Sequence, residues 1–301
     1  MIPLTRPDPF SQCHPGVNAL YFALVPVFTM FFLHPVSLAI SLVSALTYTW
    51  LLRGGRGLAR SLAMALPVFL LAAVINPAFN HRGVTILAYL PSGNPLTLES
   101  LLYGLAAAAM LAAVLLWFSC CTRVMTADKF VYLFGRVVPS LGLILSMTLR
   151  FIPRFTRRFR TVARVQKSLG RDTAEGTPLR RLRRSITILS IIIMWSLEDA
   201  IDTADSMKGR GYGLPGRTAF SLYRLDSRDR VLLLWLLLCG LYIGSGWIAG
   251  GFTWQYYPTV GGALAAPFPL SLQLTYLALC MTPVILFGKE VRTWNCLPSR
   301  P

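Results

Sequence analysis

The stretch Leu96–Phe118 reads LTLESLLYGLAAAAMLAAVLLWF. It is long enough to cross a bilayer, which takes about 20 mainly apolar residues. Only 14% of the chain is charged, whereas soluble domains average about 25%. Five further segments of the same kind are Val17–Leu33, Val36–Leu52, Leu58–Ile75, Val231–Gly250 and Phe268–Phe287. The sequence therefore predicts an all-α membrane protein with about six transmembrane helices.

The positive charge of the chain is concentrated between the fourth and fifth of these segments. Residues 119–230 carry 21 basic and 9 acidic residues, a net charge of +12 out of +17 for the whole chain. Membrane proteins keep their basic loops in the cytoplasm, and this explains the charge more simply than nucleic-acid binding. We therefore expect a membrane region over 1–118 with four transmembrane helices, a cytoplasmic or interfacial region over 119–230, and a membrane region over 231–301 with two.

The connecting loops predict the orientation. Arg53, Arg56 and Arg60 place one connection inside, whereas the connection 251–267 has no charged residue and is expected outside. Lys289 and Arg292 place the C-terminus inside. All loops agree with six spans and with both termini in the cytoplasm.

The basic region has a helical pattern of its own. An apolar run over Val137–Ile152 precedes the basic stretch Phe155–Leu169, and a second apolar run follows at Ile186–Leu197. Whether these two runs span, lie in the interface or are cytoplasmic is left open by their length. Beyond them, one side of an expected helix is acidic, at Glu198, Asp199, Asp202 and Asp205. We expect two or three amphipathic helices, each ending at glycine.

Signals for catalysis, metals or cofactors are weak. His14, His34 and His81 lie far apart, and no nucleophile motif occurs. The segment 211–218 resembles a phosphate-binding loop with arginine in place of lysine, but an apolar strand should precede such a loop and none does. We expect no catalytic residue, no metal site, no cofactor and no ATP binding by this chain.

The element Gly209-Arg210-Gly211-Tyr212 has two interpretations. It is a glycine-capped helix end with a solvated arginine, or it is a docking tip. In the second case the glycines let the arginine extend past the helix. The guanidinium then makes bidentate contacts in a partner groove, and Tyr212 adds an amphipathic anchor.

Two motifs resemble a known family. The segment Thr203–Tyr212 is similar to the A-D-A-M-x-A-R-G-Y signature of the transmembrane T component of energy-coupling factor (ECF) transporters, the cobalt/biotin-type permease family. Leu149-Arg150-Phe151-Ile152-Pro153 resembles the L-R-F-I-P element of the same family. The resemblance covers about residues 128–220.

The resemblance implies the site and the partners. In this family two coupling helices each end in an x-Arg-Gly motif that docks in one ATPase subunit. The docking residues here are then Gly209, Arg210, Gly211 and Tyr212 at the second motif, and Ser168, Leu169 and Gly170 at the first. Leu169 replaces the first arginine, and Arg171 is one position late. Supporting positions are Asp205, Met207, Arg150 and Pro153.

The resemblance further implies a non-catalytic scaffold for an importer of a vitamin or metal ion, in the cell (inner) membrane of a bacterium or archaeon. It would hold two ABC-type ATPases and one substrate-binding membrane subunit, the S component. The alternative is a polytopic membrane enzyme or a protein whose basic loop binds anionic membrane lipids. The sequence names no substrate.

Overall fold

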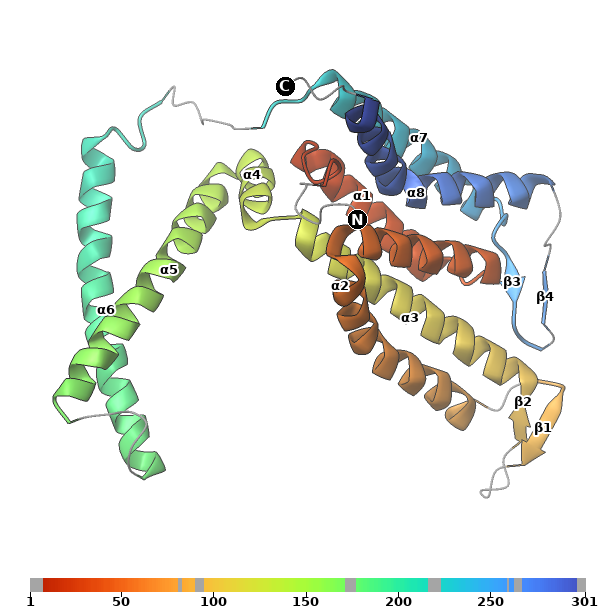
Figure 1. Ribbon diagram of the computed structural model, residues 1–301, viewed down its shortest axis with the longest axis horizontal. Helices are drawn as coiled ribbons and strands as arrows, with labels where there is room; N and C mark the ends of the chain where they lie inside the picture. The colour runs from red at the N-terminus through yellow and green to blue at the C-terminus, as the bar shows by residue number, and fades with distance from the viewer. Residues whose placement is uncertain are drawn as a thin grey trace. The chain divides into compact units, whose positions relative to one another are not determined.

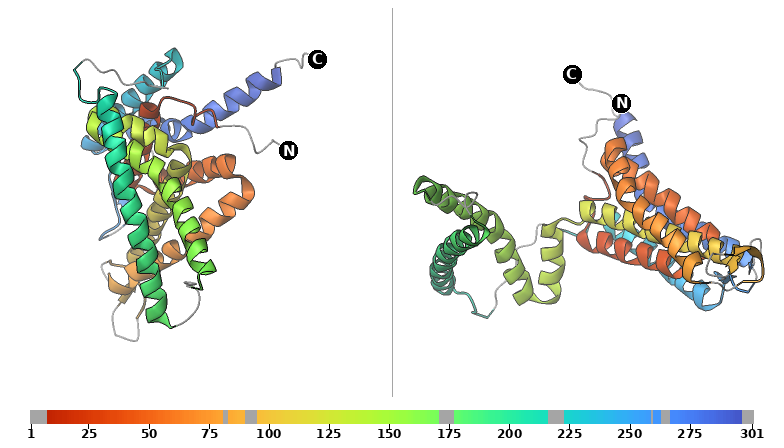
Figure 2. Two further views of the ribbon diagram at one scale, coloured as in Figure 1. Left: turned by 90° about the vertical axis from the view of Figure 1, so that its left-hand side faces the viewer. Right: turned by 90° about the horizontal axis from the view of Figure 1, so that it is seen from below.

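The computed structural model describes residues 8–80, 83–89, 95–170, 177–215, 223–258, 260–262 and 267–296 (Figures 1 and 2). It divides into two compact units. The membrane unit comprises Met1–Thr126 and Tyr223–Pro301, and the hairpin unit comprises Ala127–Leu222. Helices dominate both units, which confirms the predicted all-α class.

The membrane unit contains the predicted apolar segments as helices. They are α1 (Pro15–Phe31), α2 (Pro35–Phe79), α3 (Leu98–Val124), α7 (Ser227–Ile248) and α8 (Pro267–Cys296). Among the described residues, α2, α3, α7 and α8 are long and apolar enough to cross a bilayer, and α1 is a shorter apolar helix. The chain is a membrane protein.

Helix α2 joins two predicted spans, Val36–Leu52 and Leu58–Ile75. Its backbone is non-helical at Gly54, where φ is 69° and ψ is −178°. Glycine reaches this region without a steric penalty because it has no Cβ. The two spans are therefore separate helical arms that meet at a kink rather than at a longer loop.

Two histidines begin helices. The Nδ1 atoms of His14 and His34 accept hydrogen bonds from the backbone N–H groups of Gly16 (3.1 Å) and Val36 (3.3 Å). A proline follows each histidine at the first helical position, where the missing N–H is not needed. The histidines therefore act as N-caps of α1 and α2.

The core of the membrane unit is aromatic and cross-linked by hydrogen bonds. Trp117 of α3 donates from Nε1 to Ser41 Oγ of α2 (3.0 Å). Thr29 of α1 is hydrogen-bonded to the same Ser41 (2.8 Å) and to Tyr276 of α8 (2.9 Å). These side chains are almost fully buried, so their polar atoms are satisfied within the protein, as the bilayer interior requires.

Short strands stand between the membrane helices. Between α2 and α3, β1 (Ile86–Tyr89) pairs antiparallel with β2 (Pro95–Thr97). A second pair, β3 (Trp254–Gln255) and β4 (Gly261–Gly262), precedes α8. The sequence pattern did not predict this second pair.

The hairpin unit consists of α4 (Ala127–Val137), α5 (Pro139–Ser168) and α6 (Pro178–Gly209). Helix α4 was missed in the sequence, although its apolar face is strongly segregated. The sequence predicts Val137–Ile152 and Phe155–Leu169 as separate segments, but most of both lies in the single helix α5, while Val137 ends α4. Helix α5 continues through Pro153, which removes one backbone hydrogen bond without ending the helix.

Close packing of α4 on α5 depends on Gly142. A Cβ at Gly142 would lie 2.3 Å from the Cα of Gly135. Real side chains do not approach backbone atoms this closely. The two helices therefore pack at this point only because position 142 carries no side chain, whereas a Cβ at Gly135 would be 3.5 Å from the Cα of Gly142, an ordinary contact.

Candidate functional site

The C-terminus of α6 carries the predicted docking tip. Arg210 is the C-cap, with φ −88° and ψ 10°, and Gly211 follows with φ 78°. The N–H of Tyr212 donates to Met207 O (3.0 Å), and the N–H of Gly211 donates to Lys208 O (2.9 Å). This pair of bonds is the Schellman motif, which requires a left-handed residue after the cap. Glycine at 211 therefore fixes where the helix ends.

The C-terminus of α5 has the same local geometry. Leu169 is the C-cap, with φ −86° and ψ 11°, and Gly170 follows with φ 74°. The N–H of Gly170 donates to Lys167 O (3.0 Å). Leu169 thus occupies the position on α5 that Arg210 occupies on α6, and its side chain is 65% exposed. Arg171 lies outside the described residues.

The two helix ends are not brought together. Helix α6 begins shortly after α5 ends, and it then runs for 32 residues to Gly209, about 48 Å at 1.5 Å per residue. Figure 1 shows α5 and α6 as long rods that cross, with their C-termini at opposite ends of the pair. The hairpin unit therefore presents two separate tips with the same backbone shape.

An ion-pair cluster holds α5 against α6 near their crossing. Asp199 of α6 pairs with Arg158 and, at 3.5 Å, with Arg154 of α5. The hydrogen bond from Arg158, together with the charge of Arg154, lowers the pKa of Asp199 from its usual range. The guanidinium carbon of Arg158 also lies 6.0 Å from the ring centre of Trp195, within the range of a cation–π contact.

A small apolar cluster supports this contact. Val162 of α5 packs with Ile188 and Ile192 of α6, and these three side chains are buried.

The acidic residues on α6 lie in two different environments. Asp199 faces α5, whereas Glu198, Asp202 and Asp205 are exposed. The sequence placed all four on one side and did not identify the inter-helix role of Asp199.

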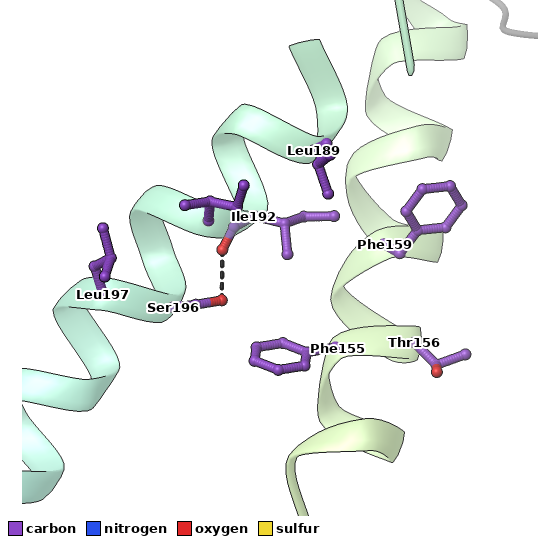
Figure 3. A pocket seen from close by; sticks show the side chains of 8 residues that line it. Phe155, Thr156, Phe159, Leu189, Ile192, Ser196 and Leu197 are labelled. Atoms are coloured by element: carbon purple, nitrogen blue, oxygen red, sulfur yellow. Dashed lines mark hydrogen bonds between the residues drawn. The ribbon is translucent and has the colours of Figure 1, made fainter. Parts of the chain in front are cut away.

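An apolar groove of about 550 Å³ lies between α5 and α6 (Figure 3). Figure 3 shows Phe155 of α5 extending toward α6, and Ile192 of α6 extending toward α5. Phe159 and Ile193 are about half exposed. The groove is therefore a preformed apolar surface on the hairpin unit, and the lining residues are Phe155, Thr156, Phe159, Leu189, Ile192, Ile193, Ser196 and Leu197.

The other predicted supporting residues fall into two places. Asp205 and Met207 lie in the last turns of α6, where Asp205 pairs with Lys208 at 3.8 Å and Met207 accepts the cap hydrogen bonds. Arg150 and Pro153 lie on α5 far from either tip and line a polar hollow with other arginines. This hollow is not predicted in the sequence analysis, although the spacing of Arg150, Arg154, Arg157 and Arg158 places them on one face of a helix.

The phosphate-loop-like segment 211–218 follows a helix, as expected, because Gly211 comes directly after the cap of α6. Its second half lies outside the described residues. The described half shows a helix end instead of the strand that a phosphate-binding loop needs before it.

About a third of the chain is similar to curated proteins named energy-coupling factor transporter transmembrane protein EcfT. The relative from Lactococcus lactis is 36% identical over 102 residues, which cover 34% of this chain and 38% of the relative. The relative from Lactobacillus helveticus is 32% identical over 108 residues, or 35% of this chain and 39% of the relative.

A relative from Exiguobacterium sibiricum is 33% identical over 114 residues, which cover 38% of this chain and 43% of the relative. The matches thus span about two-fifths of the length of these relatives. No family model matches the chain. The resemblance inferred from the two motifs is confirmed over this third of the chain.

Proposed function

We propose that this chain is the energy-coupling transmembrane subunit of an ECF-type ABC importer. The regions 1–118 and 231–301 are its membrane parts, and 119–230 is its coupling region. The observation that carries the proposal is the matched cap geometry at the ends of α5 and α6. Two equal, exposed helix ends suit attachment to two related subunits. The similarity to EcfT proteins supports the same assignment.

The chemistry of the second tip suits a polar groove on an ATPase subunit. Arg210 is exposed at the cap, and the positive φ of Gly211 turns the chain away from the helix axis. The planar guanidinium donates two parallel hydrogen bonds to a carboxylate or to backbone carbonyls. Tyr212, 46% exposed, adds apolar contact area beside it. In this proposal ATP is hydrolysed by the partners, and this chain is non-catalytic.

The long helices transmit the motion. An ATPase pair that closes on ATP moves the two tips relative to each other. Because α5 and α6 are continuous helices joined by the Asp199 ion pairs, such a displacement passes along them as a rigid-body movement. The substrate-binding membrane subunit would receive it at the crossing region.

The decisive test is charge reversal at the second tip. Arg210→Glu should abolish co-purification of the ATPase bound to α6 and abolish transport, because an acidic groove would repel the new carboxylate. Arg183→Glu, an exposed arginine near the start of α6, makes the same charge change away from that tip. Normal transport by Arg210→Glu would refute the docking role.

The first tip requires a different partner surface. Leu169 places an apolar side chain where α6 has a guanidinium, so we propose that its ATPase groove is apolar. Leu169→Asp should reduce the bound ATPase from two subunits to one per chain, since Arg210 still holds the other. Leu169→Met keeps the apolar volume and should retain both. Equal stoichiometry for the two variants would exclude an apolar contact.

We assign the groove between α5 and α6 to the substrate-binding S component. A membrane subunit exposes apolar helices, and the groove offers an apolar surface of matching character at the crossing. Ile193→Glu should weaken co-purification of this subunit by at least tenfold while leaving the ATPases bound. Ser190→Glu, exposed one turn earlier on α6, is the matched control. Equal losses in both variants would reject the assignment.

The transported substrate, a vitamin or a metal ion, belongs to the S component in this proposal. The alternative function, a polytopic membrane enzyme or a protein that binds anionic lipids, predicts no ATPase partner. Co-purification of the full chain from its native membrane therefore separates the two. Capture of ATPase subunits supports the importer, and capture of lipid alone supports the alternative.

A further inference from the structure

Four arginines of α5 gather in one polar hollow. Arg150, Arg154, Arg157 and Arg158 line it together with Pro153, and its volume is about 370 Å³. Their spacing of four, seven and eight residues places them on one face of the helix. This face differs from the one that carries Phe155 and Phe159 into the apolar groove, so α5 has a basic side and an apolar side.

The charges of this hollow are not balanced within the described residues. Asp199 pairs with Arg154 and Arg158, while Arg150 and Arg157 have no carboxylate within ion-pair distance in the described part of the chain. Arginines three and four residues apart on one helix repel each other. An anion with several acceptor oxygens would remove this repulsion and accept bidentate hydrogen bonds from the guanidinium groups.

The surroundings of the hollow indicate where this anion comes from. The part of α5 before Arg150 is apolar, and its Leu141 and Ile144 are half exposed, as is Ile152 just after Arg150. Trp195, 44% exposed, lies beside Arg158. Arginines at the end of an apolar helical segment, with tryptophan at the same level, are typical of the headgroup layer of a bilayer.

We propose that this hollow is a binding site for the phosphate group of an anionic phospholipid in the cytoplasmic leaflet. Arg150 and Arg157 contact the phosphate oxygens. Arg154 is shared between the lipid and Asp199, so a bound headgroup is adjacent to the ion pairs that join α5 to α6. The site is distinct from the two tips and does not depend on ATPase docking.

The test measures binding of fluorescent phosphatidylglycerol to the full chain in detergent. Arg150→Gln/Arg157→Gln should bind about 30-fold more weakly, because two basic charges and their bidentate contacts to the phosphate oxygens are removed. These two residues are chosen because Arg154 and Arg158, which hold the helix pair together, stay intact. Arg180→Gln/Arg183→Gln removes the same charge from exposed positions of α6 and should change the affinity less than threefold.

Competition identifies the ligand. Unlabelled phosphatidylglycerol should displace the probe. Phosphatidylcholine, which has a phosphate but no net charge, should not displace it, and neither should inorganic phosphate at about 10 mM, which is an anion without a lipid. Displacement by inorganic phosphate would overturn the lipid assignment. Equal losses of affinity in the two glutamine double variants would also overturn it, because the lipid would then respond to the overall positive charge and not to this hollow. If the glutamine variant misfolds, Arg150→Lys/Arg157→Lys decides. It keeps the charge but loses the planar fork, and unchanged affinity would refute the site.

Discussion

The two units of this protein bury their side chains in different ways. In the described part of the membrane unit, large aromatic side chains such as Trp117, Tyr21 and Tyr276 are fully buried. In the described part of the hairpin unit, the buried apolar cluster consists of Val162, Ile188 and Ile192. Helices in a bilayer associate through close packing and interhelical hydrogen bonds, so the buried, hydrogen-bonded side chains of the membrane unit hold its helices together. The described part of the hairpin unit keeps many of its apolar side chains exposed.

The largest expected effect is the loss of stability on removing Trp117, compared with the removal of Trp195. Trp117→Ala removes a fully buried ring and its hydrogen bond to Ser41, and should cost about 3–5 kcal/mol of stability. Trp195→Ala removes a half-exposed ring from the hairpin unit and should cost clearly less. Thermal unfolding of the purified chain in detergent measures both. Equal shifts in the unfolding temperature would contradict the contrast between the units.

The next effect tests the ion pairs of the hairpin unit. Asp199→Asn removes the carboxylate that Arg154 and Arg158 share, and should increase hydrogen exchange in α5 and α6 without changing exchange in the membrane unit. Asp202→Asn changes an exposed carboxylate on the same helix and serves as the control. Unchanged exchange in Asp199→Asn would show that the apolar cluster alone holds the pair.

The same carboxylate predicts a pH dependence. The folded pKa of Asp199 is lowered by Arg158 and Arg154, so its stabilisation is complete above the ordinary carboxyl pKa of about 3.9. It is lost as the pH falls through the lower folded value. Protection of α6 from hydrogen exchange should therefore persist from pH 7 to about 5 and decline below about 4. Asp199→Asn should lack this decline, and an identical decline in the variant would assign it to other groups.

The smallest effect concerns the caps. Gly211→Ala and Gly170→Ala each place a Cβ on a residue with positive φ, which costs about 1–2 kcal/mol. The cost should be larger at 211, where the new Cβ meets Leu214 at 3.0 Å, than at 170, where nothing lies within 4 Å. Gly209→Ala, inside the helix, should stabilise it by about 1 kcal/mol. Thermal unfolding followed by circular dichroism measures the change in stability for each of the three variants. Equal destabilisation by all three would contradict the predicted ranking.

Much of the fold follows from local sequence. The six apolar segments became helices because a chain in lipid must satisfy its backbone hydrogen bonds internally. Gly170 and Gly211 ended α5 and α6 near the positions that the sequence predicted, because a helix end of this type needs a left-handed residue. The candidate tips at Leu169 and Arg210 could be located in the same way, although their docking role stays a prediction.

Only the tertiary structure decided how these pieces combine. The pairing of Asp199 with Arg154 and Arg158 joins residues on two different helices, and no spacing within one helix reveals it. The polar link from Thr29 through Ser41 to Trp117 likewise depends on three helices meeting. Caps, spans and the arginine face of α5 are properties of short stretches of sequence, whereas the apolar groove needs side chains from both α5 and α6 and is therefore set by packing.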